Sequence, residues 1–184
     1  NSTKKPARAR KSKTPRNRSR PSQAALELPP TQWAEEAFYA TCGLLQDEVT
    51  AAKITWEELA AIYDDHIPRI EALNIAATYV SDVLRRCPAV HSVRVRAKSP
   101  PHLVRKVLRK RLDDPARDIR FSNYRREVTD LVGIRALHLY KEDWRPIHVF
   151  VEREWEFAEP PTAYIREGDR QAWQHEFTEA GCQV

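Results

Sequence analysis

The chain has 184 residues, of which 41% are hydrophobic, a length that allows one buried core with an appended segment. Its net charge of +5 is uneven: nine of the 31 basic residues lie in residues 1–22, which hold no acidic residue, and the other 22 face 26 acidic residues. No apolar run reaches membrane-spanning length, and three scattered cysteines without a CxxC pair argue against zinc binding. We therefore expect a cytoplasmic protein that does not enter membranes.

Residues 1–30 form the first predicted region, a basic tail. Its Lys, Arg, Ser and Pro content cannot bury enough apolar surface to offset the entropy of ordering, so we expect disorder. Such a tail can bind nucleic acid by neutralising phosphates. A solubilising linker with no partner is the alternative interpretation.

Residues 31–87 are predicted to be a helical N-terminal segment. Thr31 is a candidate N-cap for a helix over about 32–53, and Thr55 with Glu58 matches a capping box that opens a second helix. Pro68 interrupts the pattern, and a third amphipathic helix follows over about 69–86. The polar residues 64–66 superficially resemble a metal site, but we interpret them as helix-end residues.

A basic strand and a basic helix open the region 88–184. Valines and an alanine at positions 93, 95 and 97 alternate with Arg94, Arg96 and Lys98, which predicts a half-buried strand. Ser99 is a candidate N-cap and Pro100 suits the first helical turn. The helix is predicted to reach about residue 112, with an apolar stripe at Leu103, Val104, Val107 and Leu108.

The rest of the chain continues the alternation of helix and strand. Residues 113–126 are predicted to be a polar loop, 132–140 a strand, 142–150 a helix, 155–157 a short strand and 169–179 a last helix. This order indicates an α/β (α+β) domain behind the helical segment.

Two groups of cations are predicted to form a phosphate-binding surface. Arg96 and Lys98 are two apart on a strand and therefore share a face. Lys106, Arg109 and Lys110 share a face of the next helix, and the strand–helix junction adds free backbone N–H groups. Together they could hold a polyphosphate. A solvated basic face without a ligand is the alternative.

Asp130 is the candidate metal ligand, because hard divalent cations prefer carboxylate oxygens. Arg135 lies five positions on, and Gly133 offers a place where the backbone could bend to bring both side chains to one ligand. The guanidinium groups of Arg135 and Arg96 could stack on a purine base. Alternatively, Asp130 is an ordinary turn residue.

These two segments resemble the synthetase domain of the RelA/SpoT family, the alarmone (p)ppGpp synthetases. The family pattern R-x-K-[ST]-x-x-S-[IL]-x-x-K is matched at Arg96, Lys98, Ser99, Leu103 and Lys106. The pattern D-[IL]-x-G-[IVL]-R is matched over residues 130–135, and Tyr140 with Asp143 fits the Y-x-x-D that often follows. The resemblance covers roughly residues 60–184.

The resemblance implies a fold, ligands and site residues. The fold would be a nucleotidyltransferase-like mixed sheet with flanking helices. ATP would bind with its adenine between Arg96 and Arg135 and its phosphates on Lys98, Ser99 and Lys106, while Asp130 would hold Mg²⁺. The reaction would transfer the β,γ-pyrophosphate of ATP to the 3′-hydroxyl of GDP or GTP.

The chain also departs from the family pattern. His102 stands at the family's second serine, and the acceptor-site patterns G-Y-R-S-x-H and E-x-Q-I-R-T do not occur in the 184 residues. We therefore expect an incomplete synthetase portion whose second strand keeps an unpaired edge, a route to a homo-oligomer. The open alternatives are a toxin-like pyrophosphotransferase acting on tRNA or adenine nucleotides, and a non-catalytic nucleotide- or RNA-binding module.

Overall fold

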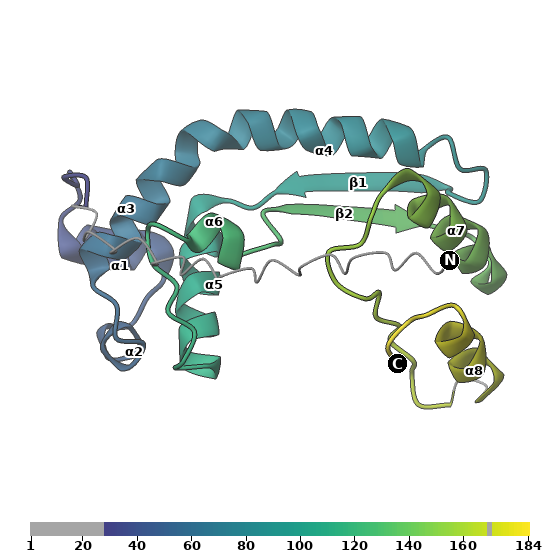
Figure 1. Ribbon diagram of the computed structural model, residues 1–184. Helices are drawn as coiled ribbons and strands as arrows, with labels where there is room; N and C mark the ends of the chain where they lie inside the picture. The colour runs from purple at the N-terminus through teal and green to yellow at the C-terminus, as the bar shows by residue number, and fades with distance from the viewer. Residues whose placement is uncertain (1–27, 169–170) are drawn as a thin grey trace, which may run out of the picture.

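The structure is a computed structural model that describes residues 28–168 and 171–184. The predicted basic tail, apart from its last three residues, lies outside the described residues. Helices and strands are mixed, as expected of an α+β protein, and no described helix is long and apolar enough to cross a membrane. The elements, shown in Figure 1, are α1 (Glu35–Cys42), α2 (Gln46–Ala51), α3 (Trp56–His66), η1 (Ile67–Arg69), α4 (Ile70–Leu84), β1 (Ser92–Ala97), α5 (Pro100–Asp113), α6 (Tyr124–Glu127), β2 (Val132–Leu137), η2 (Lys141–Asp143), α7 (Trp144–Glu154) and α8 (Gln171–Glu179).

The single helix predicted over 32–53 is wrong, because the chain forms two short helices there. Gly43 ends α1 in the left-handed region, at φ +61°, and its backbone N–H donates to the carbonyl of Tyr39. This is the usual way for a glycine to stop a helix. The turn lets Leu44 enter the core before α2 begins.

The prediction for the second helix is confirmed, with one change at its cap. The hydroxyl of Thr55 accepts a hydrogen bond from the backbone N–H of Glu58 at 3.3 Å. The Glu58 carboxylate does not return to the cap. It instead accepts hydrogen bonds from the Arg120 guanidinium and the Phe121 backbone N–H, both at 3.0 Å.

The sheet in the described residues has two antiparallel strands, β1 and β2. Val93 pairs with Ala136, Arg94 with Arg135 and Arg96 with Gly133. The long helix α4 lies along the sheet, as Figure 1 shows, and Val93 is buried. One isolated parallel bridge joins Thr162 and Gln183. The mixed sheet predicted from the family resemblance is not seen within residues 28–168 and 171–184.

The main core lies where α5 meets the N-terminal helices. The apolar stripe predicted for α5 is fully or almost fully buried, and it packs in one cluster with Phe38, Leu59 and Ile62. This core therefore draws on both sides of the domain boundary that the sequence predicts at residue 87. The boundary itself stays a prediction.

The polar loop predicted over 113–126 is wrong in part, since it contributes to this core. Residues Tyr124–Glu127 form the short helix α6, and the side chains of Ile119 and Tyr124 are fully buried. The hydroxyl of Tyr124 donates a hydrogen bond to Asp65. Because only two apolar side chains enter the core here, the segment shows no helical or strand period.

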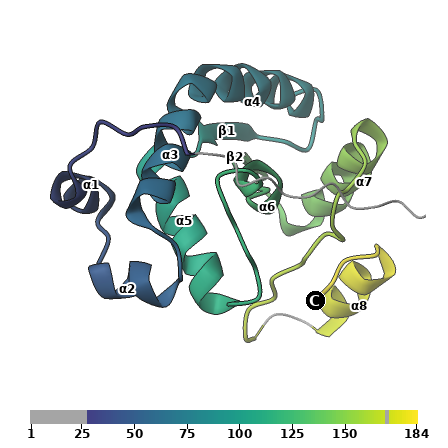
Figure 2. The ribbon, with the colours of Figure 1, turned by 60° about the vertical axis from the view of Figure 1, so that its left-hand side comes forward.

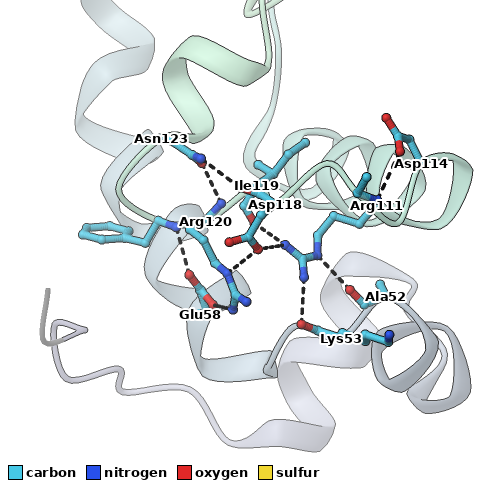
Figure 3. A network of polar contacts seen from close by, with 11 residues as sticks. Ala52, Lys53, Glu58, Arg111, Asp114, Asp118, Ile119, Arg120 and Asn123 are labelled. Carbon is cyan, nitrogen blue, oxygen red and sulfur yellow. Dashed lines mark hydrogen bonds and ion pairs between the residues drawn. The ribbon is translucent and has the colours of Figure 1, made fainter. Parts of the chain in front are cut away.

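A buried arginine fixes this loop to the N-terminal helices (Figure 3). The guanidinium of Arg111 donates to the carbonyls of Ala52, Lys53 and Ile119, at 2.8, 2.8 and 2.9 Å. It also pairs with the Asp118 carboxylate at 2.8 Å. One side chain thus joins α5, the α2–α3 turn and the loop that leads to α6.

The C-terminal helices α7 and α8 lie next to each other (Figure 2). Trp144 packs on Phe177 with ring centroids 4.4 Å apart, and Arg145 pairs with Glu176. The short strand predicted over 155–157 is wrong. Instead, α7 runs to Glu154, and the backbone N–H of Trp155 donates to Val151 to close its last turn.

Candidate functional site

An open pocket of about 580 Å³ lies between α5, the α1–α2 turn and the end of β1. Four of the six predicted site residues line it: Arg96, Lys98, Lys106 and Asp130. The remaining lining residues are Gly43, Leu44, Glu48, His102, Arg105, Leu108, Arg109, Leu112 and Asp113. The pocket is therefore rich in cations, and α5 supplies most of its wall.

The two lysines of the first motif meet the aspartate of the second. Lys98 Nζ and Lys106 Nζ each lie 3.2 Å from Asp130 Oδ2. The lysine side chains are mostly covered, at 15% and 22% exposed, while that of Asp130 is 48% exposed. Two ammonium groups on one carboxylate leave a net positive charge at the pocket wall.

The charge state of Asp130 follows from this contact. Burial acts to raise the pKa of the carboxyl, but hydrogen bonds from Lys106 and Lys98 lower it by more, and the net pKa lies below its usual value. Asp130 is thus an anion at neutral pH. Its free lone pairs face a partly open surface on which a cation could also bind.

The local fold explains how Asp130 reaches this place. Lys110 Nζ donates to the carbonyl of Glu127 at 3.1 Å, which holds the end of α6 against α5. Val128 then enters the core, and the backbone N–H of Lys98 donates to the carbonyl of Leu131 at 2.8 Å. The prediction that Lys110 belongs to the phosphate-binding surface is wrong, since this lysine does not line the pocket and holds α6 instead.

Arg96 and Arg135 lie on one exposed face of the sheet. Directly paired residues of antiparallel strands share a face, and Arg135 sits diagonally from Arg96, two residues beyond its partner Gly133. A second hollow of about 460 Å³ lies here, and Arg96 lines both this hollow and the main pocket. Arg94, opposite Arg135, is a third arginine on this face that the motifs did not single out.

The role predicted for Gly133 is wrong. β2 runs without interruption through this residue, and its φ is not positive. Asp130 lies before the strand begins, and the chain bends at Leu131 rather than at Gly133. Because Gly133 has no side chain, it leaves space opposite Arg96, on the same face of the sheet as Arg135.

Ser99 and His102 form a pair at the start of α5. Ser99 stands at the N-cap position but its side chain does not cap the helix; the Oγ atom lies 2.7 Å from His102 Nδ1. Ser99 does not line the main pocket, whereas His102 does. Of these two residues, His102 is therefore the one that faces the pocket.

Within the described residues, no group of three or more His, Cys, Asp or Glu side chains could hold a metal ion. The residues at 64–66 have structural partners, as expected: Asp64 accepts from the Trp33 indole and Asp65 from Arg69. Asp130 alone would have to share a metal with oxygens from a ligand, which is common for Mg²⁺ on nucleotides.

Sequence patterns could not show the wall formed by Gly43, Leu44 and Glu48. Gly43 and Leu44 come from the α1–α2 turn and Glu48 from α2, all far from the motifs in sequence. Arg105 and Arg109 were visible as part of a basic helix face, but their place in the pocket depends on how α5 packs. Comparison with protein-family models, curated proteins and solved structures finds no match to this chain.

Proposed function

We propose that this chain is the ATP-binding part of a RelA/SpoT-type synthetase, on a nucleotidyltransferase-like fold, that transfers pyrophosphate to the 3′-hydroxyl of GDP or GTP. The observation that carries the proposal is the meeting of two separate motifs at one carboxylate. Lys98 and Lys106 from the first motif both contact Asp130 from the second, at 3.2 Å. If either segment resembled the family pattern only by chance, there would be no reason to expect the two segments to be in contact.

The phosphates of ATP would bind at the α5 wall of the pocket. Lys98 and Lys106 supply ammonium groups there, and Arg105 and Arg109 on the same helix line the same pocket. Cations fixed in advance around a partly enclosed site stabilise phosphate charge better than mobile surface cations do.

The adenine would bind on the sheet face between Arg96 and Arg135. Diagonal neighbours across two antiparallel strands are about 7–8 Å apart, which leaves room for one flat ring between two guanidinium groups. Gly133 has no side chain to occupy that space. Because Arg96 lines both hollows, the adenine site proposed on the sheet face would lie next to the phosphate site at the α5 wall.

Asp130 would hold Mg²⁺ together with phosphate oxygens of ATP. When bound, the ion supplies charge neutralisation on those oxygens. In the reaction, the 3′-oxygen of the acceptor bonds to the β-phosphorus, the bond to the α-phosphate oxygen breaks, and AMP and one proton are released. Lys98 and Lys106 would stabilise the negative charge that develops on the phosphate oxygens.

Nucleotide binding and AMP release test the proposal separately. Calorimetry with ATP should give a dissociation constant that rises at least tenfold in Lys106→Met, because one charge-assisted phosphate contact is lost. Arg86→Ala removes an exposed cation outside the pocket and serves as the matched control. If both variants bind ATP like the unchanged protein, the pocket is not the ATP site.

AMP release from ATP is then measured with GDP, GTP, tRNA or ADP as acceptor. Release that depends on GDP or GTP supports the proposal. Release that depends on tRNA or an adenine nucleotide instead indicates the toxin-like reaction. ATP binding without AMP release with any acceptor would leave ATP binding as the only part of the proposal that stands for these 184 residues.

A further inference from the structure

His66, the last residue of α3, is a buried polar side chain that the proposed reaction does not use. Its side chain is 0% exposed, and its Nε2 lies 2.6 Å from the backbone carbonyl oxygen of Lys98. A carbonyl oxygen can only accept, so the ring carries its hydrogen on Nε2. The other ring nitrogen, Nδ1, is buried and has no hydrogen-bond partner within the described residues.

The backbone of Lys98 is held from two sides. Its carbonyl accepts from His66 on α3, and its N–H donates to the carbonyl of Leu131 just before β2. Lys98 lies directly between the end of β1 and the start of α5, where neither a strand ladder nor a helix fixes the chain. The two hydrogen bonds therefore set the position from which its side chain reaches Asp130.

Packing alone does not account for a histidine here. Burying a polar ring is unfavourable unless it is hydrogen-bonded, and an apolar side chain of similar size would fill the same space without that cost. Within the described residues, the only hydrogen bond that the His66 side chain makes is the one to the Lys98 carbonyl.

We propose that His66 is a positioning residue that fixes Lys98, so that its ammonium group meets Asp130 and the ligand phosphates. The part about Asp130 stands on the geometry alone. The part about phosphates rests on the proposed function.

The first test needs no variant. Nitrogen-15 NMR of the full chain labelled in histidine reads which ring nitrogen of His66 carries the hydrogen. The expected result is hydrogen on Nε2 in slow exchange with water. A ring with its single hydrogen on Nδ1 would overturn the proposal, because Nε2 could not donate to Lys98.

The second test compares His66→Leu, which removes the donor, with His66→Gln, whose amide N–H can reach the same carbonyl. Hydrogen exchange is measured at the amide of Lys98, and reductive methylation at its ammonium group. Both should become about 3- to 10-fold faster in His66→Leu and return close to the original rates in His66→Gln. The amide of Val128, bonded to Tyr124 within the core, is the internal control and should not change.

ATP affinity completes the test. It should weaken by about 3- to 10-fold in His66→Leu and recover in His66→Gln. Equal effects in the two variants, or equal acceleration at Lys98 and Val128, would mean that His66 only stabilises the fold. If the exchange pattern is as expected but the unchanged protein does not bind ATP, the positioning role holds and the proposed function fails.

Discussion

Replacing Asp130 by asparagine tests two roles of this residue: its observed pairing with Lys98 and Lys106, and its proposed binding of Mg²⁺. The substitution keeps the shape of the side chain and removes its charge. In the structure that charge offsets Lys98 and Lys106, each 3.2 Å away. The asparagine therefore frees two cations and removes the only predicted metal ligand.

The first effect of the substitution is on ATP binding without metal, and its size follows from the exposure of the Asp130 side chain. The Asp130 side chain is 48% exposed, so each of its ion pairs contributes about 0.2–1 kcal/mol, as exposed pairs usually do. Two such pairs amount to about 0.4–2 kcal/mol. Since 1.36 kcal/mol is a factor of ten, ATP without metal should bind about 2- to 30-fold more tightly to Asp130→Asn.

The second effect of the substitution is on ATP binding with Mg²⁺, which should become weaker rather than tighter. With Mg²⁺ present, the affinity gained from the metal should be lost, and the pyrophosphate transfer that we propose should fall by about 10²-fold, or about 2.7 kcal/mol. Calorimetry with ATP in EDTA and in Mg²⁺ measures both effects. Asp82→Asn, an exposed residue on α4 outside the pocket, makes the same change of net charge and is the control.

Two results would refute this reasoning. Weaker ATP binding in EDTA would show that Asp130 does not hold the lysines away from phosphate. An unchanged effect of Mg²⁺ on Asp130→Asn would remove the metal-ligand assignment, and with it most of the proposed mechanism.

Four other expected outcomes follow from the structure and sequence. The stabilising effect of Asp130 is present above its unfolded-state pKa and is lost as pH falls through its lower folded pKa, so Asp130→Asn should be less stable than the unchanged protein at pH 7, and this difference should shrink as pH falls below the usual carboxyl range, by denaturant unfolding. Arg111→Met should lose about 3 kcal/mol or more of unfolding free energy, because the carbonyls of Ala52, Lys53 and Ile119 lose their donor, while the exposed Asp118 carboxylate keeps its pair with Arg120; a loss below 1 kcal/mol would contradict the network's role. Gly133→Ala should melt normally, since the added methyl meets only a backbone oxygen at 3.8 Å, yet bind ATP roughly tenfold more weakly by filling the space proposed for adenine. The basic tail, if it binds RNA, should give a log–log salt slope of about −0.7 per phosphate neutralised, and a chain starting at Ser22 should lose that binding.

The sequence predicted those helices and strands in which apolar side chains recur at regular spacing. The alternation at residues 93–98 gave β1 to within one residue, and the stripe at Leu103, Val104 and Val107 gave the buried face of α5. The capping signal at Thr55 also placed the start of α3 correctly. Each of these features depends on neighbours within one turn or one strand, which is why the local pattern was sufficient.

The sequence failed where distant contacts decide the structure. Gly43 was hidden inside an apparently continuous helical pattern, and Ile119 and Tyr124 lay in a polar stretch with no period. The motifs singled out Lys98, Lys106 and Asp130 as candidates, but they could not show that the aspartate is paired with both lysines. Nor could they show that His66, on a helix far earlier in the chain, holds the backbone of Lys98.

The helix α5 explains why core and pocket cannot be separated in this protein. Its apolar face, with Leu103 and Val107, forms the centre of the core. Its polar face carries Lys106, and its last turn carries Arg111, which ties down the loop leading to α6 and Asp130. A shift of α5 would therefore move the lysine and the aspartate together. The geometry of the pocket is set by the same packing that stabilises the fold, so substitutions at Val107 should alter ligand binding as well as stability.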